Sequence, residues 1–167
     1  MNSITMLLTF ALGATLAGPS GPSVDRAGAL LSPSLACPCW EADMAEAFEL
    51  RHAGEIKAAH RKYHAVARSQ LAAGEFPGDA LWQAAVISFS EEKFARAARE
   101  LDQLAGHARE YGRLNLEVRA LFEAGILHHW SRRNDLALAR MTRVERLLAS
   151  PDVSEEVRAM VSRRLIT

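Results

Sequence analysis

The sequence predicts an all-α fold, an α-solenoid of about three antiparallel helical hairpins followed by a C-terminal capping helix. The first observation behind this is composition. From Trp40 onward the chain consists largely of Ala, Leu, Glu and Arg, which are strong helix formers, and has no strand-like alternation of apolar and polar residues. The second is that helix-breaking residues recur at regular distances, so short connections force neighbouring helices to pack antiparallel. The third is that the apolar pattern of one hairpin recurs in the next.

The overall composition limits the domain count and the class of partner. A chain of 167 residues that is 49% hydrophobic can bury one proper core, and we expect that domain at 40–167. Twenty basic and twenty acidic residues cancel, which removes the positive field that most nucleic-acid-binding proteins use. The chain also lacks a Gly-rich phosphate loop and a nucleophile elbow. We therefore expect no nucleic acid partner, no enzymatic activity and no cofactor.

Residues 1–17 resemble a secretory signal peptide. The stretch "MNSITMLLTFALGATLA" is apolar from Ile4 to Ala17 apart from small and hydroxyl residues, and it ends in small residues. It is too short to span a bilayer comfortably, so no transmembrane span is expected in the mature chain. We expect an exported protein, periplasmic or extracellular. The start "MNS" lacks the usual Lys or Arg, and the protein would be cytoplasmic if this segment is not a signal peptide.

Residues 18–39 are expected to form a flexible linker, because they are rich in Gly, Pro and Ser. The linker ends at "ACPCW", where Cys37 and Cys39 flank one proline. A disulfide across so small a ring would be strained, so two ordinary thiols are expected. The stretch "SLAC" also loosely resembles a lipoprotein cleavage box at Cys37. Two cysteines without nearby histidines do not make a zinc site.

Helix-breaking residues and N-capping residues define the expected helix ends. Gly54 ends the first helix, and "AGEFPGD" ends the second. Asp79 is expected to cap the third helix and Ser90 the fourth, with Glu91 and Glu92 in the positive first turn of the fourth. The expected helices cover about 40–53, 54–73, 79–89, 91–111, 113–131, 135–150 and 154–166, with Asn134 as cap of the sixth.

The second and fourth helices share one apolar pattern. When "GEIKAAHRKYHAV" is placed over "EKFARAARELDQL", large, small, large and apolar residues coincide with a constant offset of 38 residues. A period of about thirty to forty residues with two helices per unit is typical of α-solenoids. The aligned pairs are Ile56 with Phe94, Ala59 with Ala97, Tyr63 with Leu101 and Val66 with Leu104.

At these residues the chain resembles the tetratricopeptide repeat (TPR) family, over about Trp40 to Ala149. Units of that family combine a turn carrying Gly or an acidic residue with a large, a small and then an aromatic or aliphatic residue on the next helix. The positions that match are Gly54 and Glu92 in the turns, Ala59 and Ala97 as small residues, and Tyr63 and Leu101 as larger ones. On the preceding helices, the matching residues are Ala47, Leu50, Leu81, Ala84, Ala85, Leu121, Ala124 and Gly125.

The third unit departs from this pattern. The stretch "SRRND" is expected to make its turn about two residues longer than usual. The helix that follows can be placed in either of two registers, on Ala137, Met141 and Val144 or on Leu136 and Ala139. The sequence does not decide between them.

The first helix of each hairpin carries a second apolar stripe, at i, i+4 and i+7. In repeat proteins of the family that the chain resembles, these helices line the concave side, so the three sets should form a groove for an apolar peptide or helix of a protein partner. The expected groove residues are Met44, Phe48, Arg51, Trp82, Val86, Phe89, Phe122, Ile126 and His129, with Arg119 at the edge beside Arg51 and His129.

Two alternatives to partner binding stay open. The groove can be filled from within, by the last helix or by "AGALLSPSL" at 27–35. The hairpins can also stack end to end, which would make the protein a homo-oligomer or a subunit of a larger complex.

The remaining polar residues have structural interpretations. His60 and His64 are spaced to share a metal, but no carboxylate or cysteine near them in sequence completes a site, so we expect partly buried or solvated histidines and no metal. In "HHW", His128 and Trp130 are expected in packing and at the surface. A basic helix flank is expected to be solvated and partly paired with Asp135 and Glu145, although it suits an acidic tail or an anionic lipid surface. That flank consists of Arg132, Arg133, Arg140, Arg143 and Arg146.

Overall fold

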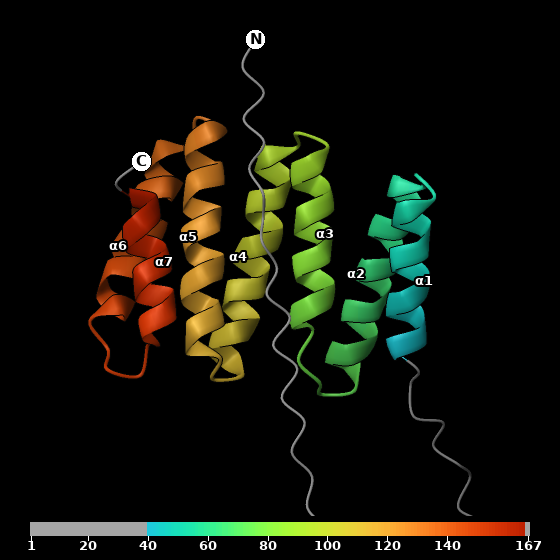
Figure 1. The fold of residues 1–167 in the computed structure, drawn as a ribbon, viewed down its shortest axis with the longest axis horizontal. Coiled ribbons are helices and arrows are strands. Elements are labelled where there is room, and N and C mark those ends of the chain that lie inside the picture. Colours follow the sequence, from blue (N-terminus) through green and yellow to red (C-terminus); the bar gives the residue numbers. More distant parts are fainter. Residues whose placement is uncertain (1–39, 166–167) are drawn as a thin grey trace, which may run out of the picture. The chain divides into compact units, whose positions relative to one another are not determined.

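The computed structural model describes residues 40–165, which form seven α-helices and no strand (Figure 1). The prediction of an all-α fold is confirmed for this range. The signal peptide, the linker and both cysteines lie outside the described residues. None of the helices in 40–165 has the length and apolarity that crossing a membrane requires. The helices are α1 (Trp40–His52), α2 (Ile56–Ala72), α3 (Gly78–Ser90), α4 (Phe94–Glu110), α5 (Leu114–Trp130), α6 (Asn134–Leu148) and α7 (Glu155–Leu165).

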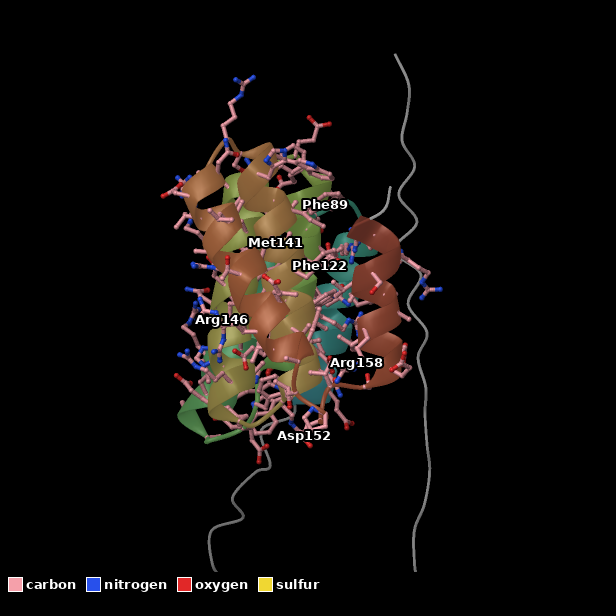
Figure 2. All side chains as sticks on the ribbon, turned by 90° about the vertical axis from the view of Figure 1, so that its left-hand side faces the viewer. Phe89, Phe122, Met141, Arg146, Asp152 and Arg158 are labelled. Carbon is pink, nitrogen blue, oxygen red and sulfur yellow. The ribbon has the colours of Figure 1, made fainter. Side chains whose placement is uncertain are left out.

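The first six helices stand side by side in chain order, and each packs against the next (Figure 1). Their connections are three or five residues long, so successive helices run antiparallel. Helices α1, α3 and α5 form one layer, and α2, α4 and α6 form the other. Helix α7 lies on the α1/α3/α5 side and packs against α5 (Figure 2).

The aligned residues of α2 and α4 occupy equivalent places in the core. Ala59 and Ala97 are fully buried, so the neighbouring helices can approach closely there. The larger residues fill the space between the helices, and Tyr63 is only 1% exposed. Buried with them are Leu101, Val66 and Leu104.

Five of the helix connections use one turn geometry. A residue with positive φ follows the helix, and the N–H of the next residue donates to the carbonyl five positions back, as in a Schellman motif. Glu55 bonds to Leu50 in this way over 2.8 Å, and Lys93 to Ser88 over 2.9 Å. The positive-φ residues are Gly54, Gly74, Glu92, Gly112 and Arg132.

This turn geometry overturns the expected N-caps. Ser90 does not cap α4: it is the last residue of α3, and its hydroxyl donates to the carbonyl of Ile87 over 2.8 Å. Glu92 takes the turn position instead, and α4 begins only at Phe94. Likewise, Asn134 and Asp79 lie inside the first turns of α6 and α3 and do not cap them.

The structure decides the register of the third hairpin. Ala137 and Val144 are buried and Met141 packs against the core, whereas Ala139 is exposed. The side chain of Met141 lies directly over Gly125 of α5, where a β-carbon would be 2.8 Å from its methyl carbon (Figure 2). The expected longer turn is wrong, because three residues separate α5 from α6, as they separate α3 from α4.

The packing of α7 on α5 is fixed by polar contacts at both ends of α7. The side-chain oxygen of Asn115 accepts the backbone N–H of Ser154 over 2.8 Å. The guanidinium of Arg158 donates to three carbonyls of the preceding connection and of the end of α6 (Figure 2). Near the C-terminal end of α7, Arg164 forms an ion pair with Glu123 of α5.

Replacing Glu92 by glycine should stabilise the protein by about 0.5–1 kcal/mol, because a residue with a β-carbon is strained at positive φ. The matched opposite change is Gly54→Ala, since no atom lies within 4 Å of the β-carbon it would add. That variant should lose about 1 kcal/mol from the backbone alone. Urea unfolding measures both changes. Equal stabilities for E92G and the parent protein would contradict the turn geometry.

Candidate functional site

All ten residues of the expected groove lie on α1, α3 and α5, the helices of one layer. The structure brings them to one layer but not to one continuous open surface. Trp82 and Phe122 are buried, whereas Phe48 is 51% exposed. The others range from half-buried, as for Met44, Arg51, Val86, Phe89 and Ile126, to exposed, as for Arg119 and His129.

Helix α7 covers the α5 part of this face. Phe122 is 1% exposed and shares one apolar cluster with Val157 and Val161 of α7. Figure 2 shows Phe122 between the two helices. The guanidinium carbon of Arg164 lies 5.5 Å from the centre of the Phe122 ring. The chain therefore fills this third of the expected groove with its own last helix.

Trp82, on α3, lies under an exposed side chain of α5. The guanidinium of the exposed Arg119 lies 5.3 Å from the centre of the indole ring, in a cation–π contact. The indole N–H is buried and has no hydrogen-bond acceptor among the described residues. Because a buried N–H without an acceptor is costly, this position favours a carbonyl group nearby.

The α1 end of the face is the open part. Phe48 is half exposed, and its ring is 4.2 Å from that of His52. Met44 packs against the core one turn earlier, and Arg51 donates to the amide oxygen of Gln83 on α3 over 3.0 Å. A large apolar side chain with a basic neighbour is thus presented to solvent here.

Phe89 belongs to a separate aromatic cluster at the turn end of the hairpins. Its ring centre lies 5.9 Å from that of Phe94 and 6.2 Å from that of Trp130, which is 43% exposed. His129 is at the same end and makes a 3.1 Å hydrogen bond with Asn134. Phe89 and His129 therefore lie at the end of the expected groove, next to the turns of the hairpins.

A buried polar cluster joins α2 to α4, and sequence reasoning missed its centre. The carboxylate of Glu100 accepts hydrogen bonds from Nε2 of His60 at 2.7 Å and of His64 at 3.1 Å. Its other oxygen accepts the Ser88 hydroxyl at 2.6 Å. The prediction of partly buried histidines is confirmed, but a carboxylate does accompany them. It comes from 36 and 40 positions away, beyond the reach of a local pattern.

Burial and hydrogen bonding act in opposite directions on this cluster. Burial alone would raise the pKa of Glu100, but hydrogen bonds from His64, Ser88 and His60 outweigh it and hold that pKa below its ordinary value. Burial lowers the pKa of His60, and the nearby Glu100 only partly offsets this. The carboxylate is therefore ionised at neutral pH, with two imidazoles directed at one of its oxygens.

The equivalent junction between α4 and α6 is an ion-pair cluster. Asp102 accepts two hydrogen bonds from Arg140, at 2.7 and 3.0 Å, and one from the buried His128 at 2.9 Å. Arg143 reaches Glu117 over 3.3 Å. The two arginines therefore pair with acids of α4 and α5. The expected pairing with Asp135 and Glu145 is wrong for them, because antiparallel packing brings distant acids closer.

A pocket of about 230 Å³ opens beside this ion-pair cluster, between α4, α5 and α6. Arg140 and Arg143 line it together with the acids that neutralise them. The pairing of these two arginines with their acids accounts for the charged lining of the pocket. Its remaining lining residues are Ala105, Gly106, Arg109, Leu121 and Ala139.

Replacing Asp102 by asparagine should cost about 1–3 kcal/mol at pH 7, because it leaves Arg140 and the buried His128 without their anion. Burial would raise the pKa of Asp102, but Arg140 and His128 hold it below its ordinary value. The folded state thus binds fewer protons than the unfolded state as the pH falls. Asp102 therefore contributes stability that is fully present above the unfolded pKa of 3.8 and is lost as the pH falls through its lower folded-state pKa.

Urea unfolding of the parent and D102N proteins, from pH 7 down to about pH 3, measures this contribution. The two stabilities should converge at acid pH. The exposed Asp152, changed to asparagine, is the control with the same loss of charge. A constant difference between parent and D102N at every pH would contradict the assignment.

Comparison of the chain with models of protein families, with curated proteins and with solved structures finds no match in any of the three. The resemblance to the TPR family therefore stays a prediction from the residue pattern.

Proposed function

We propose that residues 40–165 form an α-solenoid of three TPR-like hairpins capped by α7, and that this domain is a non-enzymatic protein-interaction module. Its partner is an apolar peptide or amphipathic helix of another protein, bound along α1 and α3. The expected export of the chain is part of this proposal and places the partner outside the cytoplasm. The support comes from the packing of α7, from equivalent positions on the three first helices and from the exposure of Phe48.

The single observation that carries the proposal is the way α7 lies on α5. Helix α7 is amphipathic: Val157 and Val161 are buried, whereas Glu155 and Arg163 are exposed. Its apolar side covers Phe122. The chain thus contains one example of an amphipathic helix bound to this face, in the helix-in-groove mode used by many peptide-binding proteins.

Equivalent positions on the other two first helices are also apolar. Alignment of the turn residues Gly54, Glu92 and Arg132 places Met44 and Trp82 at the position of Phe122. In the same alignment, Phe48 and Val86 correspond to Ile126. Apolar residues at the positions of Phe122 and Ile126 thus recur on the first two hairpins, and we propose that the partner helix lies there beside α7.

The charges at this face specify the partner further. Arg51 and the exposed Arg119 border the proposed binding surface. We therefore propose a partner helix whose apolar residues are flanked by Asp or Glu. Displacement of Arg119 from the ring would open Trp82, whose N–H has no acceptor among residues 40–165.

Self-assembly is a second candidate, favoured by one residue on α6. Leu138 is 69% exposed, whereas Ala98, at the equivalent position of α4, is fully buried. Ala98 is in the second hairpin, which is followed by another, while Leu138 is in the last. A second copy that stacks on this end would cover Leu138 as the next hairpin covers Ala98.

Phe48→Glu and Leu138→Glu separate the two candidates, because both change an exposed apolar residue and leave the core intact. A photocrosslinking residue at position 44 captures the partner, which mass spectrometry identifies. Phe48→Glu should then weaken binding of the purified partner by about 30-fold, the loss typical of an interface hot spot. Leu138→Glu should leave that affinity unchanged.

Light scattering of the same two variants tests self-assembly. A concentration-dependent oligomer that disappears in Leu138→Glu and persists in Phe48→Glu would favour the second candidate over the first. Full partner affinity in a folded Phe48→Glu variant would contradict the proposed surface. Trp82 and Phe122 are less suitable targets, because they are buried and their loss would also destabilise the fold.

A further inference from the structure

The junction between α2 and α4 brings together three side chains that are typical metal ligands. His60 and His64 are one helical turn apart on α2, and Glu100 reaches them from α4. One ligand atom from each of the three residues lies within 4.8 Å of the other two. We propose that His60, His64 and Glu100 bind a divalent transition-metal ion of the zinc type.

The residue types and the spacing both fit such an ion. Zinc binds imidazole nitrogen and carboxylate oxygen at about 2.0–2.2 Å, so neighbouring ligand atoms in a tetrahedral site are about 3.3 Å apart. The Glu100 oxygen is already 2.7 Å from Nε2 of His60 and 3.1 Å from Nε2 of His64. To hold an ion that replaces the two Nε2 protons, the Glu100 oxygen would move back from both nitrogens by a few tenths of an ångström, and the two imidazole nitrogens already lie within 4.8 Å of each other.

Hydrogen bonds from neighbouring side chains orient the Glu100 carboxylate, as a metal ligand requires. The fully buried Ser88 donates its hydroxyl to one carboxylate oxygen at 2.6 Å, so the other oxygen is left for the ion. Hydrogen-bonded carboxylates of this kind are usual around metal sites. Ser88 in turn accepts Nε of Arg96 at 2.9 Å.

Arg96 is a cation close to the site, and it pairs mainly with an acid outside the site. Its Nε lies 3.9 Å from the Glu100 oxygen that faces the histidines. Its Nη2 makes a 2.8 Å ion pair with Glu91. Glu91 also pairs with Lys93 over 2.9 Å, so it offsets only part of the charge of Arg96, and an ion at the site would share Glu100 with this guanidinium.

The equivalent junction one hairpin later argues against a purely structural role. There, Arg140 of α6 pairs with Asp102 of α4, and His128 supplies the single imidazole that hydrogen-bonds to the same carboxylate. A helix contact of this type therefore does not require two imidazoles on one oxygen. The pair His60 and His64 is the feature that a metal site explains and an ion pair does not.

Solvent can reach the proposed site. The side chains of His64 and His60 are 25% and 13% exposed, whereas that of Glu100 is 6% exposed. Three protein ligands leave at least one coordination position for water or another small ligand. The site is on α2 and α4, so it does not involve the α1 and α3 surface of the proposed function, and either proposal can fail alone.

Calorimetric titration of the full chain with Zn²⁺ tests the proposal, and Co²⁺ absorption reports the ligand geometry. Cys37 and Cys39 are replaced by serine in all proteins, since thiolates bind zinc. One ion per chain is expected, with an increase in melting temperature. His64→Gln and Glu100→Gln should each weaken binding by about 100-fold or more, and Ser88→Ala by about 10–100-fold.

The double variant His107→Ala/His129→Ala is the matched control, because it removes two histidines outside the cluster, and it should bind as the parent does. Circular dichroism confirms that each variant is folded. His60→Gln/His64→Gln keeps polar side chains beside Glu100 and provides the decisive test if Glu100→Gln unfolds. Absence of binding to the parent protein, or parent-like affinity in the folded double glutamine variant, would overturn the proposal.

Discussion

Contact between small side chains on neighbouring helices is the constraint on which the rest of the structure depends. Ala59, Ala84, Ala97 and Ala124, on four successive helices, are all fully buried. Such residues allow helix axes to approach to about 8–10 Å, and a larger side chain at any of them would push two helices apart. The polar junctions depend on the same spacing, because Glu100 meets His60 and His64 only while α2 and α4 stay close.

Much of the helical arrangement could be predicted from the sequence, because it depends on local pattern. The period of Ala59, Tyr63 and Val66 identified the buried side of α2, and its recurrence identified that of α4. The helix ends were predicted less well. Ser90 has the chemistry of an N-cap, but five turns in the described residues share one backbone hydrogen bond of the Schellman type, and in two of them the residue with positive φ is not glycine.

The polar contacts were beyond prediction for a different reason. Glu100 is far from both histidines in sequence, and Arg140 and Arg143 reach acids 38 and 26 positions away. Sequence spacing suggests partners one turn away, whereas antiparallel packing selects partners on another helix. The covering of Phe122 by α7 was an open alternative, since the apolar stripe is the same whether it binds a partner or the chain itself.

The central claim is that each hairpin is stabilised by its neighbours in a row. Native-state hydrogen exchange of backbone amides tests it most directly, because repeat arrays protect inner units more than terminal ones. We predict stronger protection in α2 to α5, which have a neighbouring helix on both sides, than in α1, which has one on one side only among the described helices. Equal protection of α1 and α4, with all helices opening in one step, would contradict the claim.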